Sequence, residues 1–202
     1  MKIVLASNNA HKLEELRAIL SQLGLEVVSQ KEMGITIEPD ENGTTFEENS
    51  YIKAKAIQDV CGLATIADDS GLMVDALDGA PGILSARFGG DACKTDRDRL
   101  EYLLEQMRAV EEEKRGAKFV SVITMLYPDG RKLVARGECP GTILYRAEGN
   151  NGFGYDPVFY VPECGCTFAQ LTAEEKNAIS HRARALAVLR DLLLKEKTYV
   201  DK

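Results

Sequence analysis

Hydrophobic and polar residues alternate along this chain with two periods, one typical of β-strands and one typical of α-helices. Short apolar runs between turn-forming residues predict strands over residues 2–6, 25–30, 63–67, 72–76, 118–127, 131–138, 141–146 and 157–161. Apolar residues three and four positions apart predict helices over residues 12–23, 46–60 and 95–110, and a final long helix that begins near residue 172. This alternation of strands and helices predicts an α/β fold.

Cap and turn residues refine this prediction. Thr44 with Glu47 and Thr172 with Glu175 have the spacing of a capping box at the start of a predicted helix. Thr95 and Asp98 can cap the helix between these two. The Pro-Asp-Gly sequence at residues 128–130 separates two strand-like runs and predicts an antiparallel hairpin. The sheet is therefore predicted to be mixed.

The composition limits the functions that this chain is compatible with. It has 202 residues, of which 45% are hydrophobic, and no apolar stretch approaches the roughly 20 residues that a membrane span needs. The formal net charge of -7 argues against a nucleic-acid partner and requires any phosphate site to be a local cationic pocket. An odd number of cysteines, five, and a first strand without a secretory segment before it predict a soluble protein of the reducing cytoplasm.

The turn between the first predicted strand and the first predicted helix is a candidate phosphate site. Residues 7–12 read Ser-Asn-Asn-Ala-His-Lys, and the backbone N–H groups at the start of a helix favour an anion. Lys12 adds a positive charge. The alternative is an ordinary helix cap, in which Ser7 or Asn9 accepts hydrogen bonds from the first N–H groups of the helix.

The adjacent carboxylates Asp68 and Asp69 are candidates for metal binding and acid–base chemistry. Both are predicted at the end of a strand, where neighbouring side chains point to opposite faces, so one is expected to reach a site that the other supports. Carboxylate oxygens suit Mg²⁺ bound to a polyphosphate, whereas the alternative is a turn, which Asp-Ser-Gly favours. Residues 38–43 form an acidic loop, in which Asp40 and Glu41 can complete a metal shell. Lys53 on the next helix can contact phosphate. Solvated surface is the alternative for these three residues.

The last third of the chain holds candidates for base recognition. Residues 153–156, Phe-Gly-Tyr-Asp, combine aromatic rings that can stack on a nucleobase with a flexible backbone, although core packing also explains such aromatics. Lys176, His181 and Arg182 can donate hydrogen bonds to the oxygens of a purine, or else face solvent. No Ser-His-Asp order and no Gly-x-Ser-x-Gly motif favours a covalent intermediate, so direct attack by water is expected.

Six sequence blocks occur in the order found in the inosine/xanthosine triphosphate pyrophosphatases, the Ham1-like family. These blocks are residues 7–12, 45–49, 67–72, 79–82 with 85–87, 152–157, and 175–177 with 180–182. Matching blocks from end to end are far more specific than any one of them, and the chain resembles this family along nearly its whole length. The resemblance implies one domain over residues 1–202, with an elongated mixed β-sheet flanked by helices and two lobes around a nucleotide-binding cleft. It also implies a homodimer.

The same resemblance implies Mg²⁺-dependent hydrolysis of ITP, dITP or XTP to the nucleoside monophosphate and pyrophosphate, an activity that cleans the nucleotide pool. It makes Asp69 the catalytic carboxylate and, together with Asp40, a metal ligand. The substrate contacts that it implies are Ser7, Asn8, Asn9, Ala10, His11, Lys12, Lys53, Ser70, Phe153, Gly154, Tyr155, Asp156, Lys176, His181 and Arg182. The family usually has Glu where Asp40 stands, so the sequence leaves open whether Asp40 or Glu41 reaches the metal.

Two other functions are compatible with the same residues. One is a broader nucleotide pyrophosphatase that acts on pyrimidine or oxidised nucleotides, which a substrate panel distinguishes. The other is a nucleotide-binding regulator without turnover, which the Asp68–Asp69 pair and the acidic loop disfavour.

Overall fold

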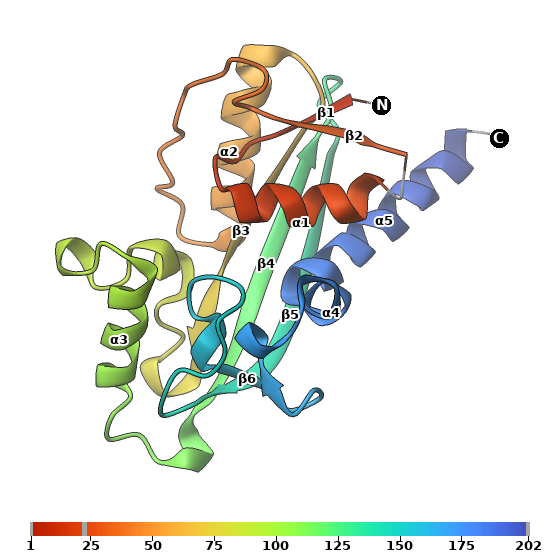
Figure 1. Cartoon of the computed structure of the whole chain (residues 1–202). Coiled ribbons are helices and arrows are strands. Elements are labelled where there is room, and N and C mark those ends of the chain that lie inside the picture. The colour runs from red at the N-terminus through yellow and green to blue at the C-terminus, as the bar shows by residue number, and fades with distance from the viewer. Residues whose placement is uncertain (1, 22–23, 201–202) are drawn as a thin grey trace. The chain divides into compact units, whose positions relative to one another are not determined.

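The chain has the predicted α/β fold with a mixed sheet, as seen in a computed structural model that describes residues 2–21 and 24–200 (Figure 1). The strands are β1 Lys2–Leu5, β2 Glu26–Ser29, β3 Thr65–Val74, β4 Gly116–Leu126, β5 Lys132–Ile143, β6 Phe159–Val161 and β7 Cys166–Thr167. The helices are α1 Ala10–Leu20, α2 Phe46–Cys61, α3 Asp96–Gln106, α4 Ala173–Ile179 and α5 His181–Val200. The side chain of His11 and the predicted helix end at Leu23 lie outside the described residues.

Within the described residues, the strands form one seven-stranded sheet in the order β2-β1-β3-β4-β5-β6-β7. Strand β1 is parallel to both β2 and β3, whereas β6 is antiparallel to both β5 and β7. Strands β4 and β5 are joined by the predicted turn, in which the N–H of Gly130 donates to the carbonyl oxygen of Tyr127 at 3.0 Å. The prediction of a mixed sheet is therefore confirmed.

Two compact units divide the chain. The first comprises Met1–Asp69, Ser121–Gly137 and Arg182–Lys202, and the second comprises Ser70–Val120 and Glu138–His181. Strands β3, β4 and β5 contribute residues to both units. The prediction of a single domain with two lobes around a cleft stays a prediction.

In the first unit, helices pack against both faces of the strands. One face carries Ile3, Leu5, Ile66 and Ile123 and packs against α1 and α5. The other face carries Val4, Ala6 and Ala67 and packs against α2. Because successive side chains of a strand point to opposite faces, the position of a residue along β3 decides which helix it meets.

The core of the second unit is built around aromatic rings. Phe119 of β4 packs edge-on against Phe159 of β6, with ring centroids 4.7 Å apart, and it stacks on Phe168 at 5.8 Å. Leu100 and Leu103 of α3 pack into the same cluster. Thr95 and Asp98 cap α3 as predicted, and they do so as a capping box, in which the side chain of each accepts the backbone N–H of the other.

The predicted end of a strand at the two carboxylates is wrong. Strand β3 runs unbroken through residues 68–71, and the two predicted strands on either side are its two halves. Of its ten residues, all except Ser70 and Met73 are buried. Burial among neighbouring strands therefore overrides the local preference of Asp-Ser-Gly for a turn.

The predicted long final helix is also wrong, because it is two helices. Helix α4 has the predicted capping box at Thr172 and Glu175, but Ser180 then adopts a ψ of 160°, which breaks the helix. The second helix, α5, begins at His181. His181 and Arg182, which were predicted on one helix with Lys176, thus belong to α5.

No described helix is long and apolar enough to cross a membrane.

Two smaller predictions also need correction. The cap of α2 is Thr45 rather than Thr44, because the side chain of Thr45 accepts the N–H of Glu48 at 3.1 Å. The carboxylate of Glu48 accepts the N–H of Thr44 at 2.6 Å, so the predicted capping box between Thr44 and Glu47 is wrong. Residues 141–143 extend β5 rather than forming a separate strand, and the sequence did not predict β7.

Candidate active site

Asp68 and Asp69 contact different helices because they point to opposite faces of β3. Asp68 continues the face of Ile66 and meets Lys12 of α1 and Arg182 of α5. Asp69 continues the face of Ala67 and meets Lys53 of α2. The expected division, in which only one of the two carboxylates faces a given site, follows from this alternation along the strand.

Lys53 links Asp69 to the acidic loop. Its Nζ lies 2.7 Å from Oδ1 of Asp69 and 3.2 Å from Oε2 of Glu41. Burial alone would lower the pKa of Lys53, but the negative charges of Asp69 and Glu41 raise it above its ordinary value. Lys53 is therefore a buried cation, and the alternative of a solvated helix residue is wrong.

The structure separates the two acidic residues that the sequence left as alternatives. Glu41 is partly buried and reaches Lys53, whereas the neighbouring Asp40 is exposed. The geometry therefore places Glu41 rather than Asp40 beside Asp69.

Asp69 has the properties of a metal ligand. It is 5% exposed, and its Oδ2 is buried without a hydrogen-bond partner among the described residues, whereas its Oδ1 binds Lys53. Burial raises the pKa of this carboxyl above its ordinary value, and the charge of Lys53 offsets only part of that effect. A cation at Oδ2 would satisfy the buried oxygen, which otherwise costs free energy.

The carboxylates near Lys53 fit Mg²⁺ that is bound partly by substrate and water better than they fit a metal ion bound by protein ligands alone. No group of three or more His, Cys, Asp or Glu side chains in the described part of the chain is arranged to hold a metal ion. Magnesium is usually bound by one or two carboxylates, with phosphate oxygens and water completing its shell. Asp69 and Glu41 match that pattern.

Asp68 is the centre of a buried ion-pair network. Its Oδ2 lies 2.9 Å from Nζ of Lys12 and 3.2 Å from a guanidinium nitrogen of Arg182, and the hydroxyl of Ser121 donates to its Oδ1. Burial would raise the pKa of this carboxyl, but Arg182 and Lys12 hold it well below its usual range. Arg182, 1% exposed, also pairs with Glu15 of α1. Asp68 is therefore a fixed anion that positions two cations.

The turn before α1 has the local geometry of a helix cap. The side chain of Asn9 accepts the N–H of Lys12 at 3.1 Å, and the hydroxyl of Ser7 accepts the N–H of Asn9 at 3.1 Å. Asn8, Asn9 and Ala10 are exposed, and Ser7 is half-buried. This cap holds Lys12 next to Asp68, and phosphate binding by residues 7–12 stays a prediction.

In the second unit, the predicted base-binding loop is closed by Asp156. Its Oδ2 accepts the N–H of Phe153 at 2.9 Å and lies 2.7 Å from Nζ of Lys176, which is 5% exposed. Gly152 is required here, because its φ is +75° and a Cβ would lie 2.1 Å from that oxygen. The Lys176 ammonium also lies 4.6 Å from the centre of the Phe153 ring. The loop, Asp156 and Lys176 thus form one connected group.

The remaining predicted base contacts have different surroundings. His181 is 4% exposed and stacks on Phe119, with ring centroids 4.8 Å apart and planes 14° apart. Tyr155 is a core residue whose hydroxyl donates to the carbonyl oxygen of Ser85 at 2.9 Å, as the core-packing alternative expected. Ser70 is half-buried on β3 directly after Asp69. Lys176, His181 and Arg182 are all buried, so the solvent-facing alternative for them is wrong.

Sequence reasoning missed several partners of these groups. Glu15 binds Arg182, Ser121 binds Asp68, and the rings of Phe119 and Phe168 both stack on His181. Local sequence carries no signal for such pairs, since 167 positions separate Glu15 from Arg182. Only the alternation of β4 indicates that Ser121 shares a face with Ile123.

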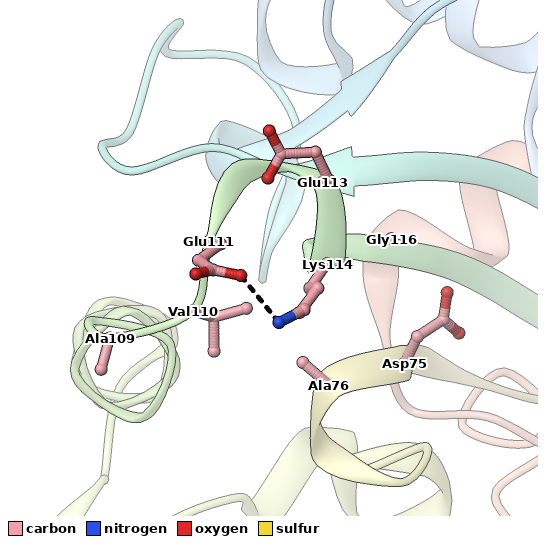
Figure 2. A pocket seen from close by; sticks show the side chains of 8 residues that line it. All are labelled: Asp75, Ala76, Ala109, Val110, Glu111, Glu113, Lys114 and Gly116. Carbon is pink, nitrogen blue, oxygen red and sulfur yellow. Dashed lines mark ion pairs between the residues drawn. The ribbon is translucent and has the colours of Figure 1, made fainter.

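A separate hollow in the second unit carries none of the predicted site residues (Figure 2). Its volume is about 660 Å³, and Asp75, Glu111, Glu113 and Lys114 give it charged walls. Figure 2 shows Lys114 turned toward Glu111, with the two charges 2.7 Å apart. Its excess of carboxylates disfavours a triphosphate, so the candidate site remains the group around Asp69 and Lys53.

Comparison with known proteins gives one consistent result. A model of the Ham1 family matches residues 3–192. The dITP/XTP pyrophosphatase of Clostridium perfringens is 48% identical over 95% of this chain and 97% of that protein. The Ham1 protein of Staphylococcus aureus superimposes with a TM-score of 0.86 at 41% identity, over 97% of this chain and 100% of that one. The HAM1 protein of Coxiella burnetii gives a TM-score of 0.87 at 41% identity, over 96% of this chain and 99% of that one.

Proposed function

Because this chain belongs to the Ham1 family, we propose that it is a pyrophosphatase that hydrolyses dITP, ITP and XTP to the nucleoside monophosphate and pyrophosphate. The observation that supports this most directly is the buried oxygen of Asp69 without a hydrogen-bond partner among the described residues, next to the cation Lys53. That arrangement suits a phosphate chain that carries a divalent cation. Magnesium as cofactor, a homodimer and a cytoplasmic location belong to the same proposal.

In the proposed mechanism, Lys12 and Lys53 offset the charge of the triphosphate. Asp69 and a carboxylate of the acidic loop would hold Mg²⁺, which when bound withdraws charge from the phosphate oxygens. Asp69 also orients the attacking water and accepts its proton. The water oxygen bonds to phosphorus, the bond between the α and β phosphates breaks, and pyrophosphate leaves without a covalent enzyme intermediate.

Selectivity for the base is assigned to Phe153, Lys176, His181 and Arg182. Lys176 and His181 are held by aromatic rings, and the carboxylates Asp68 and Glu15 fix the plane of the Arg182 guanidinium. Donors fixed in this way favour the 6-oxo group of a deaminated purine. The amino group of adenine would leave them unpaired, which is a strong basis for rejection.

The experiment that tests the function is pyrophosphate release from ITP, dITP, XTP, GTP and ATP, with Mg²⁺ and with EDTA. We expect release that depends on Mg²⁺ and is confined to ITP, dITP and XTP; rejection of GTP, which also has a 6-oxo group, requires that the site exclude its 2-amino group. Equal release from every nucleotide would instead indicate a broad pyrophosphatase. Tight ITP binding without release would indicate a nucleotide-binding regulator.

A second prediction concerns the acidic loop. We expect Glu41→Gln to raise the Mg²⁺ concentration for half-maximal pyrophosphate release by about tenfold or more, because Glu41 lies next to Lys53 and Asp69. The matched control Asp40→Asn removes a neighbouring exposed carboxylate and should shift that concentration much less. Isothermal titration of Mg²⁺ into the protein, with inosine monophosphate and pyrophosphate present, provides a readout independent of turnover. A larger shift in Asp40→Asn would assign the metal contact to Asp40.

A further inference from the structure

The carboxamide of Asn49 is fully buried, although the proposed mechanism gives this residue no role. It lies in the second turn of α2 and is 0% exposed. Its Oδ1 accepts the N–H of Gly43, the last residue of the acidic loop, at 2.9 Å. Its Nδ2 is buried and has no hydrogen-bond partner among the described residues. A buried donor left in that state costs free energy, so a bound acceptor would be strongly favoured.

The position of Asn49 on α2 indicates what that acceptor is. Asn49 precedes Lys53 by four residues, so the two side chains lie on the same face of the helix. Lys53 binds Asp69, and Oδ2 of Asp69, like Nδ2 of Asn49, is buried without a hydrogen-bond partner among the described residues. An amide N–H cannot bind a metal, but it donates to an anionic oxygen, as the Lys53 ammonium does.

We propose that Asn49 is a substrate-binding residue, whose Nδ2 donates a hydrogen bond to a phosphate oxygen of the triphosphate while its Oδ1 fixes the end of the acidic loop. The inference rests on the proposed function of this site. In this proposal the Asn49 side chain both binds substrate and holds the end of the acidic loop. The close contact between the loop and Asn49 explains why the loop ends in glycine. A Cβ at Gly43 would lie 2.7 Å from the Asn49 oxygen and 2.7 Å from Cβ of Glu48.

The test is isothermal titration of ITP in EDTA, where no turnover is expected, for wild type, Asn49→Asp, Asn49→Ala and Gly43→Ala. Asn49→Asp keeps an oxygen for the Gly43 N–H but replaces the donor. Gly43→Ala keeps the Asn49 side chain, but its Cβ crowds the Asn49 oxygen, so it disturbs the contact between the loop and the carboxamide. We expect both Asn49 variants to raise the Kd for ITP by about tenfold or more, because hydrogen bonds to charged groups are the strong ones. Gly43→Ala should raise it less.

A role in loop positioning alone predicts a different result. Asn49→Asp, which keeps the oxygen that accepts the Gly43 N–H, would then bind ITP like wild type, and that result overturns the inference. Thermal melts establish that each variant is folded. If wild type binds ITP but releases no pyrophosphate with Mg²⁺, the proposed function fails, and the Kd values still decide the role of Asn49.

Discussion

Replacing Asp69 with Asn is expected to reduce pyrophosphate release from ITP by about a thousandfold or more and to leave the chain folded. General-base catalysis alone contributes on the order of 10²–10⁴ in rate, and this variant also removes a charged oxygen from the metal site. The fold should survive because Lys53 keeps Glu41 as a partner. An amide at position 69 can still accept a hydrogen bond from the Lys53 ammonium. The measurement is kcat for ITP at saturating Mg²⁺, together with a thermal melt.

Glu38→Gln is the control for this experiment. Glu38 is an exposed carboxylate at the start of the acidic loop of residues 38–43, and removing its charge should leave kcat close to that of wild type. Near-normal turnover in Asp69→Asn would refute the assignment of Asp69 as base and metal ligand. A variant that is inactive because it has unfolded would be recognised by its melt.

The parts of the fold that depend on local patterns were predictable from the sequence. The cap at Thr95, the capping box at Thr172 and the Pro-Asp-Gly hairpin all occur where their residues predict them. These signals act within a few residues, and at these three places the surrounding structure agrees with them. The alternation of side chains along a strand also predicted that Asp68 and Asp69 would point to opposite faces of the sheet.

Features that depend on the neighbouring strands were not predictable in the same way. Residues 68–71 have the composition of a turn, but Leu72 and Val74 are 0% exposed, and their burial keeps β3 extended past the carboxylates. The break at Ser180 has a partial local signal, because Ser is favoured at helix boundaries. The helical spacing of the apolar residues on either side masked this signal.

The candidate site shows the same limit. Sequence motifs marked Lys12, Lys53, Asp69 and Lys176, but not which carboxylate each cation meets. Lys12 pairs with Asp68 and Lys53 pairs with Asp69, because the two carboxylates point to opposite faces of β3. Arg182 was expected to bind a purine, and its pairing with Asp68 and Glu15 could be found only in the folded chain.

Replacing Arg182 with Met is expected to lower the free energy of unfolding by about 3–5 kcal/mol. Removing one member of a buried ion pair costs about this much, because the partner charge stays buried. Here Asp68 has a side chain that is 0% exposed and would keep only Lys12 as an ion-pair partner of those described, while Glu15 would lose its pair with Arg182. Methionine fills a similar volume, so a cavity contributes little. Urea denaturation followed by circular dichroism measures the change.

The same helix supplies the control, Arg190→Met. Arg190 lies on α5, is about half exposed and pairs with its neighbour Asp191 at 3.1 Å. A solvent-exposed pair of this kind contributes roughly 0–1 kcal/mol, so this variant should unfold at nearly the urea concentration of wild type. An equally small effect of Arg182→Met would mean that Lys12 and Ser121 stabilise the Asp68 charge without Arg182. The network would then be a poor explanation for the low pKa of Asp68, whose principal cause is the charge of Arg182, opposing burial.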